Sequence, residues 1–564
     1  MAKYLRPEHP MPQFYRDTWV NLNGEWEFYE DYSVSAYERG AMKPDFEYPL
    51  TINVPFCRES VLSGLGHTDF CDSVWYRKKI SIPESFKGKR TLLHIGACDY
   101  KTTVYVNGRV AAKHIGGYVP VNADITDLLC EGENVIVVHA LDFLRDGNQP
   151  GGKQCREFYS HGCSYTRTTG IWQTVWLEAV PEAYIKKFKF YPSVEESKLS
   201  VTVEAENADT MTLNAVAFYE GVPVGAASSV LSGKTCSFEI DLSELHLWEI
   251  GNGRLYDIEL TLGKDSVKSY FGMRSIANDK GTLVLNGKKV FQRLILDQGF
   301  YPDGIYTARE DSELEADVLR SVACGFHGAR LHQKIFEPRF LWYCDKHGYI
   351  VWGEHGNWGL DISRPEAWQG FIPEWCEAVE RDFNHPAIIG WCPLNETQAN
   401  QNSEFVKAVA SVTRMLDPTR LYIDASGWTH VDGVTDIMDL HKYEQDPQKL
   451  AEFLAPLEEG KPIDIRRGYI GMPTFVSEYG GIRWPIEGAG WGYGESVKNE
   501  QGFLDRFAGL AEVLLNNKFL SGLCYTQLTD VEQEVNGLYY YDRRPKFDCE
   551  ILKKAISAKA AIEE

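Results

Sequence analysis

Short runs in which apolar and polar residues alternate fill the first third of the chain. Residues 90–97 (RTLLHIGA), 102–111 (TTVYVNGRVA) and 133–141 (ENVIVVHAL) show this period of two, which is typical of strands with one buried face. Asn107-Gly108 lies between two such half-runs, and both residues tolerate a positive φ, so the pair predicts a hairpin turn. Residues 1–181 are therefore expected to form a β-sandwich of the jelly-roll type.

The alternating pattern continues over residues 182–276. Runs such as KLSVTVEAE (198–206), TLNAVAFYE (212–220) and LYDIELTLG (255–263) are joined by polar turns and show no helical period. The segment also has about the length of an immunoglobulin-like sandwich. We expect a second β-sandwich here, of the immunoglobulin-like type.

From residue 277 onward, apolar strand-like runs alternate with helical stretches. Thr307 and Glu310 are spaced as a capping box at the start of one predicted helix, and Gly348 is placed to end another. Strands alternating with helices in this number fit a (β/α)8 barrel over residues 277–564. The eight candidate strands are 290–298, 327–332, 349–354, 387–396, 420–426, 437–443, 473–480 and 520–530.

Composition narrows the classes of partner. The chain has 564 residues with 58 basic and 80 acidic side chains, a formal charge of −22, which disfavours nucleic acids and anionic membrane surfaces as partners. No stretch reaches ~18 apolar residues, and the first residues lack an apolar signal core. The 13 cysteines contain no CxxC pair, so we expect free thiols and a cytoplasmic location.

Polar side chains follow nearly all of the predicted barrel strands. Because the carboxyl ends of barrel strands meet at one opening, these side chains are expected to converge there. Their number favours an active site over a solvated rim. They are Asp297, Gln298, Arg330, His332, Glu354, His355, Asn395, Glu396, His441, Tyr443, Glu478, Tyr479 and Asp530.

Glu396 after the fourth strand and Glu478 after the seventh suggest glycoside hydrolysis, which needs one protonated and one ionised carboxyl group. Apolar packing beside Glu396 is expected to raise its pKa, and the Tyr443 hydroxyl is a candidate donor to Glu478. A carboxyl separation of ~5–5.5 Å would indicate retention of anomeric configuration, and ~6.5–9.5 Å inversion.

Several motifs make the chain resemble glycoside hydrolase family 2, the family of β-galactosidases, β-glucuronidases and β-mannosidases. The order of the three predicted domains is that of the family, and NLNGEWEF (21–28), VWYRK (74–78) and TGIWQTVWLE (169–178) resemble its N-terminal landmarks. FNHPAIIGWCPLNE (383–396) resembles the family's acid/base segment, and PTFVSEYGG (473–481) its nucleophile segment.

The resemblance implies a retaining double displacement without a cofactor. Glu478 would attack the anomeric carbon, and Glu396 would serve as acid and then base. Asn395 would bind the sugar 2-hydroxyl, Tyr443 would orient Glu478, and Arg330 would hold Glu478 electrostatically. A homo-oligomer is also compatible with the resemblance.

The chain departs from the family pattern at the sugar pocket. His332 lies one position nearer to Arg330 than in the common family motif, and Tyr525 stands where many relatives carry a Trp. β-Glucuronidases carry an Asn-x-Lys motif, but here Asn536 is followed by Leu538. A neutral sugar therefore fits better, unless another cation such as Arg483 or Lys334 holds a sugar carboxylate.

Other candidates have two interpretations each. Asp297, Glu354 and Asp530 could bind sugar hydroxyls or satisfy one another, while Glu532 and Glu534 are expected to face solvent or structural partners. No zinc site is expected, because the histidines of the predicted barrel lack metal-ligand spacing, and no metal ligands are assigned. Some members of the family bind Mg²⁺ or Na⁺ near the site through carboxylates, so such an ion is an open alternative. Trp358, Trp484 and Trp491 are either aromatic walls of the sugar site or packed side chains.

The sequence thus predicts an exo-acting retaining glycosidase that takes a small-molecule glycoside of a neutral sugar, with β-galactosidase activity as the first choice. α-L-Arabinofuranosidase and β-glucuronidase activity are alternatives on the same scaffold. A catalytically inactive carbohydrate-binding protein is the alternative from another class, and a structural scaffold is a third. The intact pair Glu396 and Glu478 with Asn395 favours the enzyme.

Overall fold

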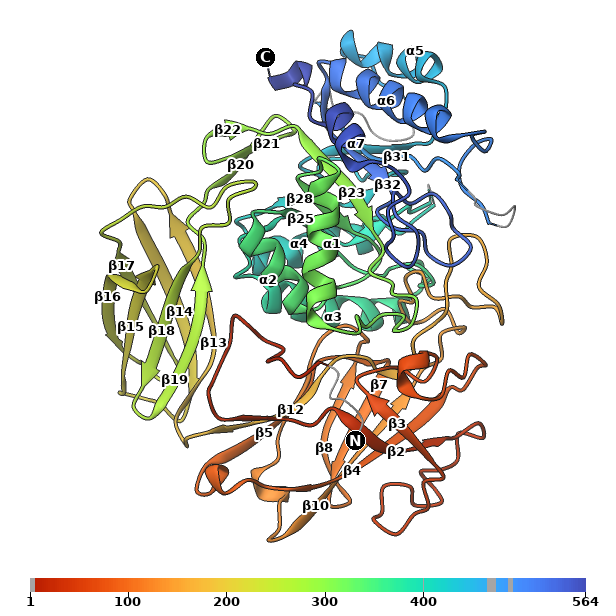
Figure 1. Cartoon of the computed structure of the whole chain (residues 1–564). Coiled ribbons are helices and arrows are strands. Elements are labelled where there is room, and N and C mark those ends of the chain that lie inside the picture. Colours follow the sequence, from red (N-terminus) through yellow and green to blue (C-terminus); the bar gives the residue numbers. More distant parts are fainter. Residues whose placement is uncertain (1–5, 399, 464–472, 485–489, 564) are drawn as a thin grey trace.

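Two β-sandwiches and a parallel barrel follow one another along the chain in the computed structural model (Figure 1). The structure describes residues 6–398, 400–463, 473–484 and 490–563. The jelly roll lies below in red and orange, the immunoglobulin-like sandwich lies at the left in yellow-green, and the barrel lies above in green to blue. The predicted fold class is confirmed. We propose domain boundaries after residues 181 and 276.

The jelly roll packs a six-stranded antiparallel sheet, in the order β3-β2-β4-β10-β7-β8, against a four-stranded sheet, β1-β12-β5-β9. Alternate side chains of both sheets meet in one apolar core, as the period of two predicted. The strands are β1 (Trp19–Asn21), β2 (Gly24–Glu30), β3 (Leu50–Val54), β4 (Ser73–Ser81), β5 (Arg90–Ile95), β6 (Cys98–Asp99), β7 (Lys101–Val106), β8 (Arg109–Ile115), β9 (Val121–Asp124), β10 (Glu133–Leu141), β11 (Gly170–Ile171) and β12 (Val175–Val180).

The predicted hairpin turn is present between β7 and β8. Asn107 and Gly108 have φ values of 51° and 75°, the left-handed conformations that a two-residue turn of this kind needs. The hairpin prediction is therefore confirmed.

The second sandwich consists of the sheets β13-β14-β17 and β16-β15-β18-β19, and all its strand pairs are antiparallel. A separate apolar core fills the space between the two sheets. The strands are β13 (Tyr184–Ser193), β14 (Lys198–Glu206), β15 (Thr212–Tyr219), β16 (Val222–Val230), β17 (Thr235–Asp241), β18 (Tyr256–Leu262) and β19 (Asp265–Phe271). The short strands β20 (Ile276–Asp279), β21 (Thr282–Leu285) and β22 (Lys288–Lys289) lead on to the barrel.

All eight predicted barrel strands are present. They form one parallel sheet in the order β28-β26-β25-β24-β23-β32-β31-β30. Side chains of the strands are almost all buried, which explains their near-continuous apolar runs. The strands are β23 (Gln292–Asp297), β24 (Gly328–Leu331), β25 (Ile350–Glu354), β26 (Ile388–Cys392), β28 (Leu421–Tyr422), β30 (Met438–Lys442), β31 (Thr474–Gly480) and β32 (Leu520–Thr526).

Helices connect most of these strands. Loop residues 427–437, with no helix, join the fifth strand to the sixth. The helices are α1 (Asp311–Ala323), α2 (Pro338–His347), α3 (Pro365–Asp382), α4 (Ser403–Leu416), α5 (Pro447–Glu458), α6 (Glu500–Asn516) and α7 (Cys549–Ile556).

The capping box predicted at Thr307 and Glu310 is wrong. Glu310 is itself the N-cap of α1 and its side chain makes no capping hydrogen bond. The Thr307 hydroxyl instead donates to the carbonyl oxygen of Trp172 at 2.5 Å, so it joins the barrel to the jelly roll. By contrast, Gly348 ends α2 in the left-handed conformation with φ 63°, as predicted.

The barrel sheet is completed beyond its fourth and fifth strands by two short strands. β27 (Leu394–Asn395) continues after β26 and pairs in parallel with β29 (Ala425–Ser426), which follows β28. Ser426 in turn donates a hydrogen bond to Asp439 of β30 at 2.7 Å. Asn395 thus ends β27 and Glu396 follows it. Both residues lie at the carboxyl end of the fourth barrel strand, where β27 pairs with β29.

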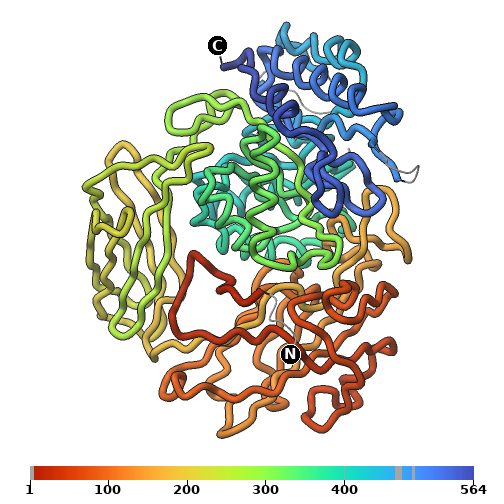
Figure 2. The backbone as a smooth tube through the Cα atoms, in the orientation of Figure 1, coloured from red at the N-terminus to blue at the C-terminus, as the bar shows by residue number. Residues whose placement is uncertain are grey.

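The jelly roll is attached to the barrel by buried polar contacts. The Tyr118 main-chain N–H donates to Glu374 of α3 at 2.7 Å. The long loop of residues 142–169 between β10 and β11 reaches the barrel opening, where Tyr165 donates to Glu534 at 2.5 Å. Figure 2 shows this orange loop beside the blue C-terminal segment.

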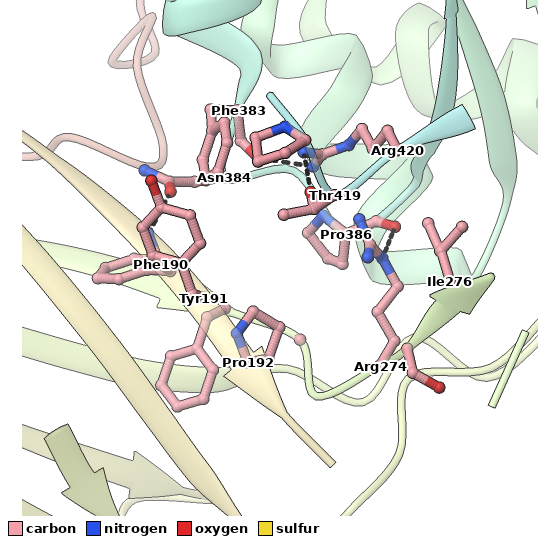
Figure 3. A pocket seen from close by; sticks show the side chains of 14 residues that line it. Phe190, Tyr191, Pro192, Arg274, Ile276, Phe383, Asn384, Pro386, Thr419 and Arg420 are labelled. Carbon is pink, nitrogen blue, oxygen red and sulfur yellow. Dashed lines mark hydrogen bonds between the residues drawn. The ribbon is translucent and has the colours of Figure 1, made fainter. Parts of the chain in front are cut away.

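A cavity of about 270 Å³ separates part of the immunoglobulin-like sandwich from the barrel (Figure 3). Phe190, from β13, donates its N–H to Asn384 Oδ1 at 2.9 Å, and Arg274 donates to the Pro386 carbonyl at 2.6 Å. Asn384 and Pro386 precede β26, so this cavity lies at the amino ends of the barrel strands. Chemistry in such barrels sits at the opposite ends, so we interpret the cavity as part of a structural contact.

All 13 cysteines are free thiols, and most are buried, as the sequence predicted. Among the described residues, no helix is long and apolar enough to cross a membrane.

Gly348→Ala is expected to destabilise the protein more than an ordinary glycine substitution. The left-handed φ costs an alanine about 1–2 kcal/mol, and the added Cβ would also meet the carbonyl oxygen of Glu249. Gly132→Ala is the matched control, since it has φ +85° with nothing within 4 Å of the added Cβ. Thermal unfolding should give the order wild type, Gly132→Ala, Gly348→Ala; equal midpoints for the two variants would contradict the argument.

Candidate active site

The guanidinium of Arg330 joins four strand ends at the barrel opening. Arg330 lies on β24 and is only 1% exposed. Its Nε donates to Glu354 Oε1 at 2.6 Å, its Nη1 to Glu478 Oε1 at 3.0 Å, and its Nη2 to Asn395 Oδ1 at 3.1 Å. The planar fork of an arginine suits this three-way contact. Predicted site residues from β24, β25, β27 and β31 are therefore brought together.

Tyr443 holds the other oxygen of Glu478. Its hydroxyl donates to Glu478 Oε2 at 2.5 Å, and its ring stacks on Tyr493 with centroids 3.4 Å apart. Burial and the charge of Glu478 hold the pKa of Tyr443 well above its ordinary value. The hydroxyl therefore remains a proton donor to the carboxylate.

Glu396 faces Glu478 across a histidine. Glu396 follows β27 with φ 52°, an uncommon conformation for a residue other than glycine. His441 Nδ1 lies 2.8 Å from Glu396 Oε1 and 3.3 Å from Glu478 Oε2. One oxygen of each carboxylate and the ring nitrogen all lie within 4.8 Å of one another. The two predicted carboxylates are thus neighbours.

The expected rise in the pKa of Glu396 is wrong for the structure as it stands. Burial by itself would raise this pKa, but the hydrogen bond and charge of His441, with the charges of Lys153 and Arg330, lower it below the ordinary value. The apolar strand before Glu396 indicates burial in the sequence, but nothing next to Glu396 in the sequence indicates the histidine that faces it.

His332 and Glu354 lie beside Glu478 in the same cluster of buried side chains. His332 Nδ1 lies 3.2 Å from Glu354 Oε2 and 3.9 Å from Glu478 Oε1. Burial and the nearby charges of Lys153 and Arg330 hold the pKa of His332 well below its ordinary value, so this imidazole is neutral. The shifted position of His332 in the sequence still places it in the site.

Three other predicted sugar contacts already have partners within the protein. Asp297 Oδ1 accepts from the Gly299 N–H at 2.8 Å, and Asp530 Oδ1 accepts from Lys546 Nζ at 2.6 Å. The Trp484 ring packs edge-on against Phe547, with centroids 5.5 Å apart. Contact of these three residues with a sugar stays a prediction.

Lys334, one alternative for holding a sugar carboxylate, is also engaged. It donates to the carbonyl oxygens of Gly299 and Tyr306 at 2.6 and 2.9 Å. Burial lowers the pKa of Lys334 to about 7.

Lys153 is a site residue that the sequence argument missed. It belongs to the jelly-roll loop, is 5% exposed, and places its ammonium 3.9 Å from the centroid of the Trp358 ring. Among the described residues, no hydrogen bond or ion pair to this ammonium is found. Burial lowers the pKa of Lys153, but the interactions with Cys163, Glu534, Glu478 and Glu396 raise it above the ordinary value. Nothing in the sequence near Lys153 indicates that this loop reaches the barrel.

Glu534 is a fourth carboxylate at the opening. It is 2% exposed, accepts from Tyr165 at 2.5 Å and accepts from Asn536 at 3.0 Å. Burial raises the pKa of Glu534, and the charge of Lys153 opposes this rise. Glu534 has the structural partners that were expected, but they lie beside the candidate site.

The cluster of Glu396, His441 and Glu478 is compact enough to hold a cation. However, a direct hydrogen bond of 2.8 Å already joins His441 to Glu396. We therefore interpret the cluster as a proton-sharing site rather than as a set of metal ligands.

Comparison with family models covers most of the chain. The model described as glycosyl hydrolases family 2, sugar binding domain, matches residues 20–181, and the one described as glycosyl hydrolases family 2 matches residues 183–274. The family 2 TIM barrel domain matches residues 337–560. Fold, carboxylate pair and domain order together define a member of the glycoside hydrolases. The chain belongs to glycosyl hydrolase family 2.

Individual relatives carry two different names. A β-galactosidase of Thermoanaerobacter pseudethanolicus is 26% identical over 492 residues, covering 83% of this chain and 62% of that protein. A putative β-glucuronidase of Formosa agariphila is 26% identical over 370 residues, covering 61% of this chain and 44% of that protein. The chain thus spans less than two thirds of the length of these curated relatives.

Solved structures agree on the fold. The β-glucuronidase from Ruminococcus gnavus in complex with D-glucuronic acid aligns with a TM-score of 0.81 at 18% identity, over 98% of this chain and 100% of that one. At this identity the likeness supports the arrangement of domains and not the choice of sugar.

Arg330→Met is expected to destabilise the protein strongly at neutral pH, by about 3–5 kcal/mol, because buried Glu354 and Glu478 would lose their cation. Adding Glu354→Gln should restore part of the loss, since one of the uncompensated charges disappears. Chemical denaturation of the single and double variants measures both effects. A double variant less stable than Arg330→Met would count against this electrostatic role.

Proposed function

We propose that the chain is a retaining glycosidase that works by double displacement, with Glu478 as nucleophile and Glu396 as acid and base. The supporting observation is that oxygens of the two carboxylates lie within 4.8 Å of each other. That spacing agrees with the ~5–5.5 Å carboxyl separation of retaining enzymes and leaves too little room for the water of an inverting one.

In the first step, a Glu478 oxygen bonds to the anomeric carbon while the glycosidic bond breaks. The electron pair stays on the leaving oxygen, which takes the proton of Glu396. In the second step, Glu396 removes a proton from water, and the resulting hydroxide oxygen displaces Glu478. Arg330 and Tyr443, each bound to one oxygen of Glu478, hold the carboxylate in position before attack and support its departure.

Asn395 is placed to bind the sugar at its 2-hydroxyl. Its Oδ1 accepts from Arg330, which fixes the side-chain amide, while its buried Nδ2 has no hydrogen-bond partner within the part of the chain that the structure describes. A buried donor without a partner is costly, so a substrate oxygen that accepts from it would be favoured. Such a contact strengthens as charge develops on the sugar ring.

A neutral sugar, with β-galactosides as the first choice, fits the charges of the site. Four carboxylates act there, from Glu354, Glu396, Glu478 and Glu534. They face the two fixed cations Arg330 and Lys153. A further carboxylate on the sugar would enter a negative field, which costs free energy at short range. Leu538, which is buried, also occupies the position where the family's glucuronidases place a lysine. α-L-Arabinofuranosidase activity stays an alternative on the same neutral-sugar grounds.

β-Glucuronidase activity is the second candidate, and the observation that favours it is Lys153. Its buried ammonium lacks a hydrogen-bond partner among the described residues. A sugar carboxylate could accept hydrogen bonds from it.

The carbohydrate-binding alternative explains the site less well. A binding protein has no need for two carboxylates held against each other, since their mutual repulsion destabilises the empty site.

The free thiols fit a reducing compartment, and we propose a cytoplasmic location.

Glu478→Gln is expected to lower turnover of the accepted aryl glycoside by several orders of magnitude, since covalent catalysis is lost. A 2-fluoro glycoside of the same sugar with a good leaving group should label the wild type but not the variant, and intact-mass spectrometry would show one added glycosyl group. Near-normal turnover by Glu478→Gln would refute the mechanism. Asp17→Asn, at an exposed position of the jelly roll, is the control.

Lys153→Met separates the two sugars. If substrates are neutral, the variant should keep the wild-type ranking of a panel of aryl galactoside, arabinofuranoside, mannoside, fucoside and glucuronide. If glucuronides are preferred, the variant should lose at least about 100-fold in kcat/KM on the glucuronide alone, as expected when a charge pair worth ~3 kcal/mol is removed.

A further inference from the structure

Both ring nitrogens of His441 are engaged in hydrogen bonds. Nδ1 faces Glu396 Oε1 at 2.8 Å, and Nε2 lies 3.0 Å from Ser426 Oγ. The ring packs tightly against Gly427, where an added Cβ would collide with it. His441 is therefore held in one orientation, between the acid/base candidate and the buried hydroxyl of Ser426.

The hydroxyl of Ser426 determines which nitrogen carries a proton. It can donate its one hydrogen to Asp439 Oδ2 at 2.7 Å or to Ser477 Oγ at 3.1 Å. Asp439 is a buried carboxylate that also accepts from the Gly427 N–H at 3.1 Å. With the serine hydrogen directed toward these groups, Ser426 Oγ accepts from His441, so Nε2 carries a hydrogen.

Nδ1 then has two possible states. It carries a proton and donates to ionised Glu396, or it is bare and accepts from protonated Glu396. The two states contain the same atoms and have the same total charge, and they differ by the transfer of one proton along the 2.8 Å hydrogen bond. A pair that shares a proton in this way titrates as a unit.

We propose that His441 shares with Glu396 the proton that passes to the leaving oxygen, and so acts as the positioning residue of the acid/base group. This inference rests on the proposed function. The sequence indicated only that His441 is a polar residue at the end of the sixth predicted barrel strand.

Two further carboxylates lie near the His441 ring in the resting enzyme. Nδ1 lies 3.3 Å from Glu478 Oε2, and Asp439 interacts electrostatically with the ring. Among the described residues, the titratable and charged groups that face this pair are Glu354, Glu478, Asp439, His332, Arg330, Lys153, Cys163 and Tyr493.

The nucleophilic step then drives the proton toward the substrate. When Glu478 bonds to the anomeric carbon its negative charge is consumed, so the imidazolium loses its second carboxylate partner. The proton is then held more weakly on His441, and Glu396 delivers it to the leaving oxygen as the glycosidic bond breaks. After this step Glu396 is ionised and His441 is neutral, ready to accept one proton from water in the second step.

The pH profile of kcat/KM tests the proposal. Its alkaline limb reports loss of the shared proton. Without His441 the proton has only Glu396 to hold it, so His441→Asn should move this limb to lower pH by about one unit or more. The acidic limb should move less, because Tyr443 and Arg330 still bind Glu478. Ser426→Ala, which removes the acceptor of Nε2, should shift the alkaline limb in the same direction by a smaller amount.

Leaving-group dependence supplies the second readout. His441→Asn should lose at least about tenfold more kcat/KM on an alkyl or phenyl glycoside than on the 2,4-dinitrophenyl glycoside, which needs little acid assistance. His327→Gln is the matched control, because that partly buried histidine precedes β24 at the opposite end of the barrel. Its pH limbs and leaving-group ratio should equal those of the wild type.

The outcomes are separable. If the alkaline limb is unchanged both in folded His441→Asn and in Ser426→Ala, the shared proton is overturned. The proposed function still stands in that case if Glu396→Gln loses activity selectively on poor leaving groups. If Glu396→Gln shows no such selectivity, the proposed function itself fails. Should His441→Asn not fold, the direction of the shift in Ser426→Ala decides.

Discussion

The buried guanidinium of Arg330 is the contact on which the site depends. A cation with 1% exposure needs carboxylates around it, and it obtains them from β25 and β31, together with the Asn395 amide after β26. These three side chains belong to separate βα units of the barrel. Their convergence on one arginine keeps the strand ends in register and holds Glu478 with one oxygen facing Tyr443.

Glu396 is held differently from Glu478. The nucleophile candidate accepts hydrogen bonds from Arg330 and Tyr443, whereas Glu396 faces the imidazole of His441. The lowered pKa of Glu396 in the structure does not conflict with its proposed role as acid, because we propose that the proton is shared with His441 across their 2.8 Å contact. Two carboxylates thus acquire two roles from their neighbours and not from their own chemistry.

The jelly roll contributes to the site as well as to the fold. Its loop of residues 142–169 carries Lys153 into the opening and binds Glu534 through Tyr165. The barrel opening is therefore lined by residues of two domains. Differences in this loop offer a physical route by which proteins sharing the barrel and the carboxylate pair could accept different sugars, since the loop adds a charge without altering the pair.

The sequence by itself determined the strands, the barrel and the two glutamates, because buried parallel strands read as apolar runs and their polar ends mark the opening. It also identified Arg330, Asn395 and Tyr443 through motifs on those strand ends. It failed at Thr307, whose hydroxyl binds another domain, and at the pKa of Glu396, which depends on a histidine 45 residues away. Lys153 and the hydrogen-bond directions at His441 were decided only by the tertiary structure, since they depend on which loops and side chains meet across domains and strands.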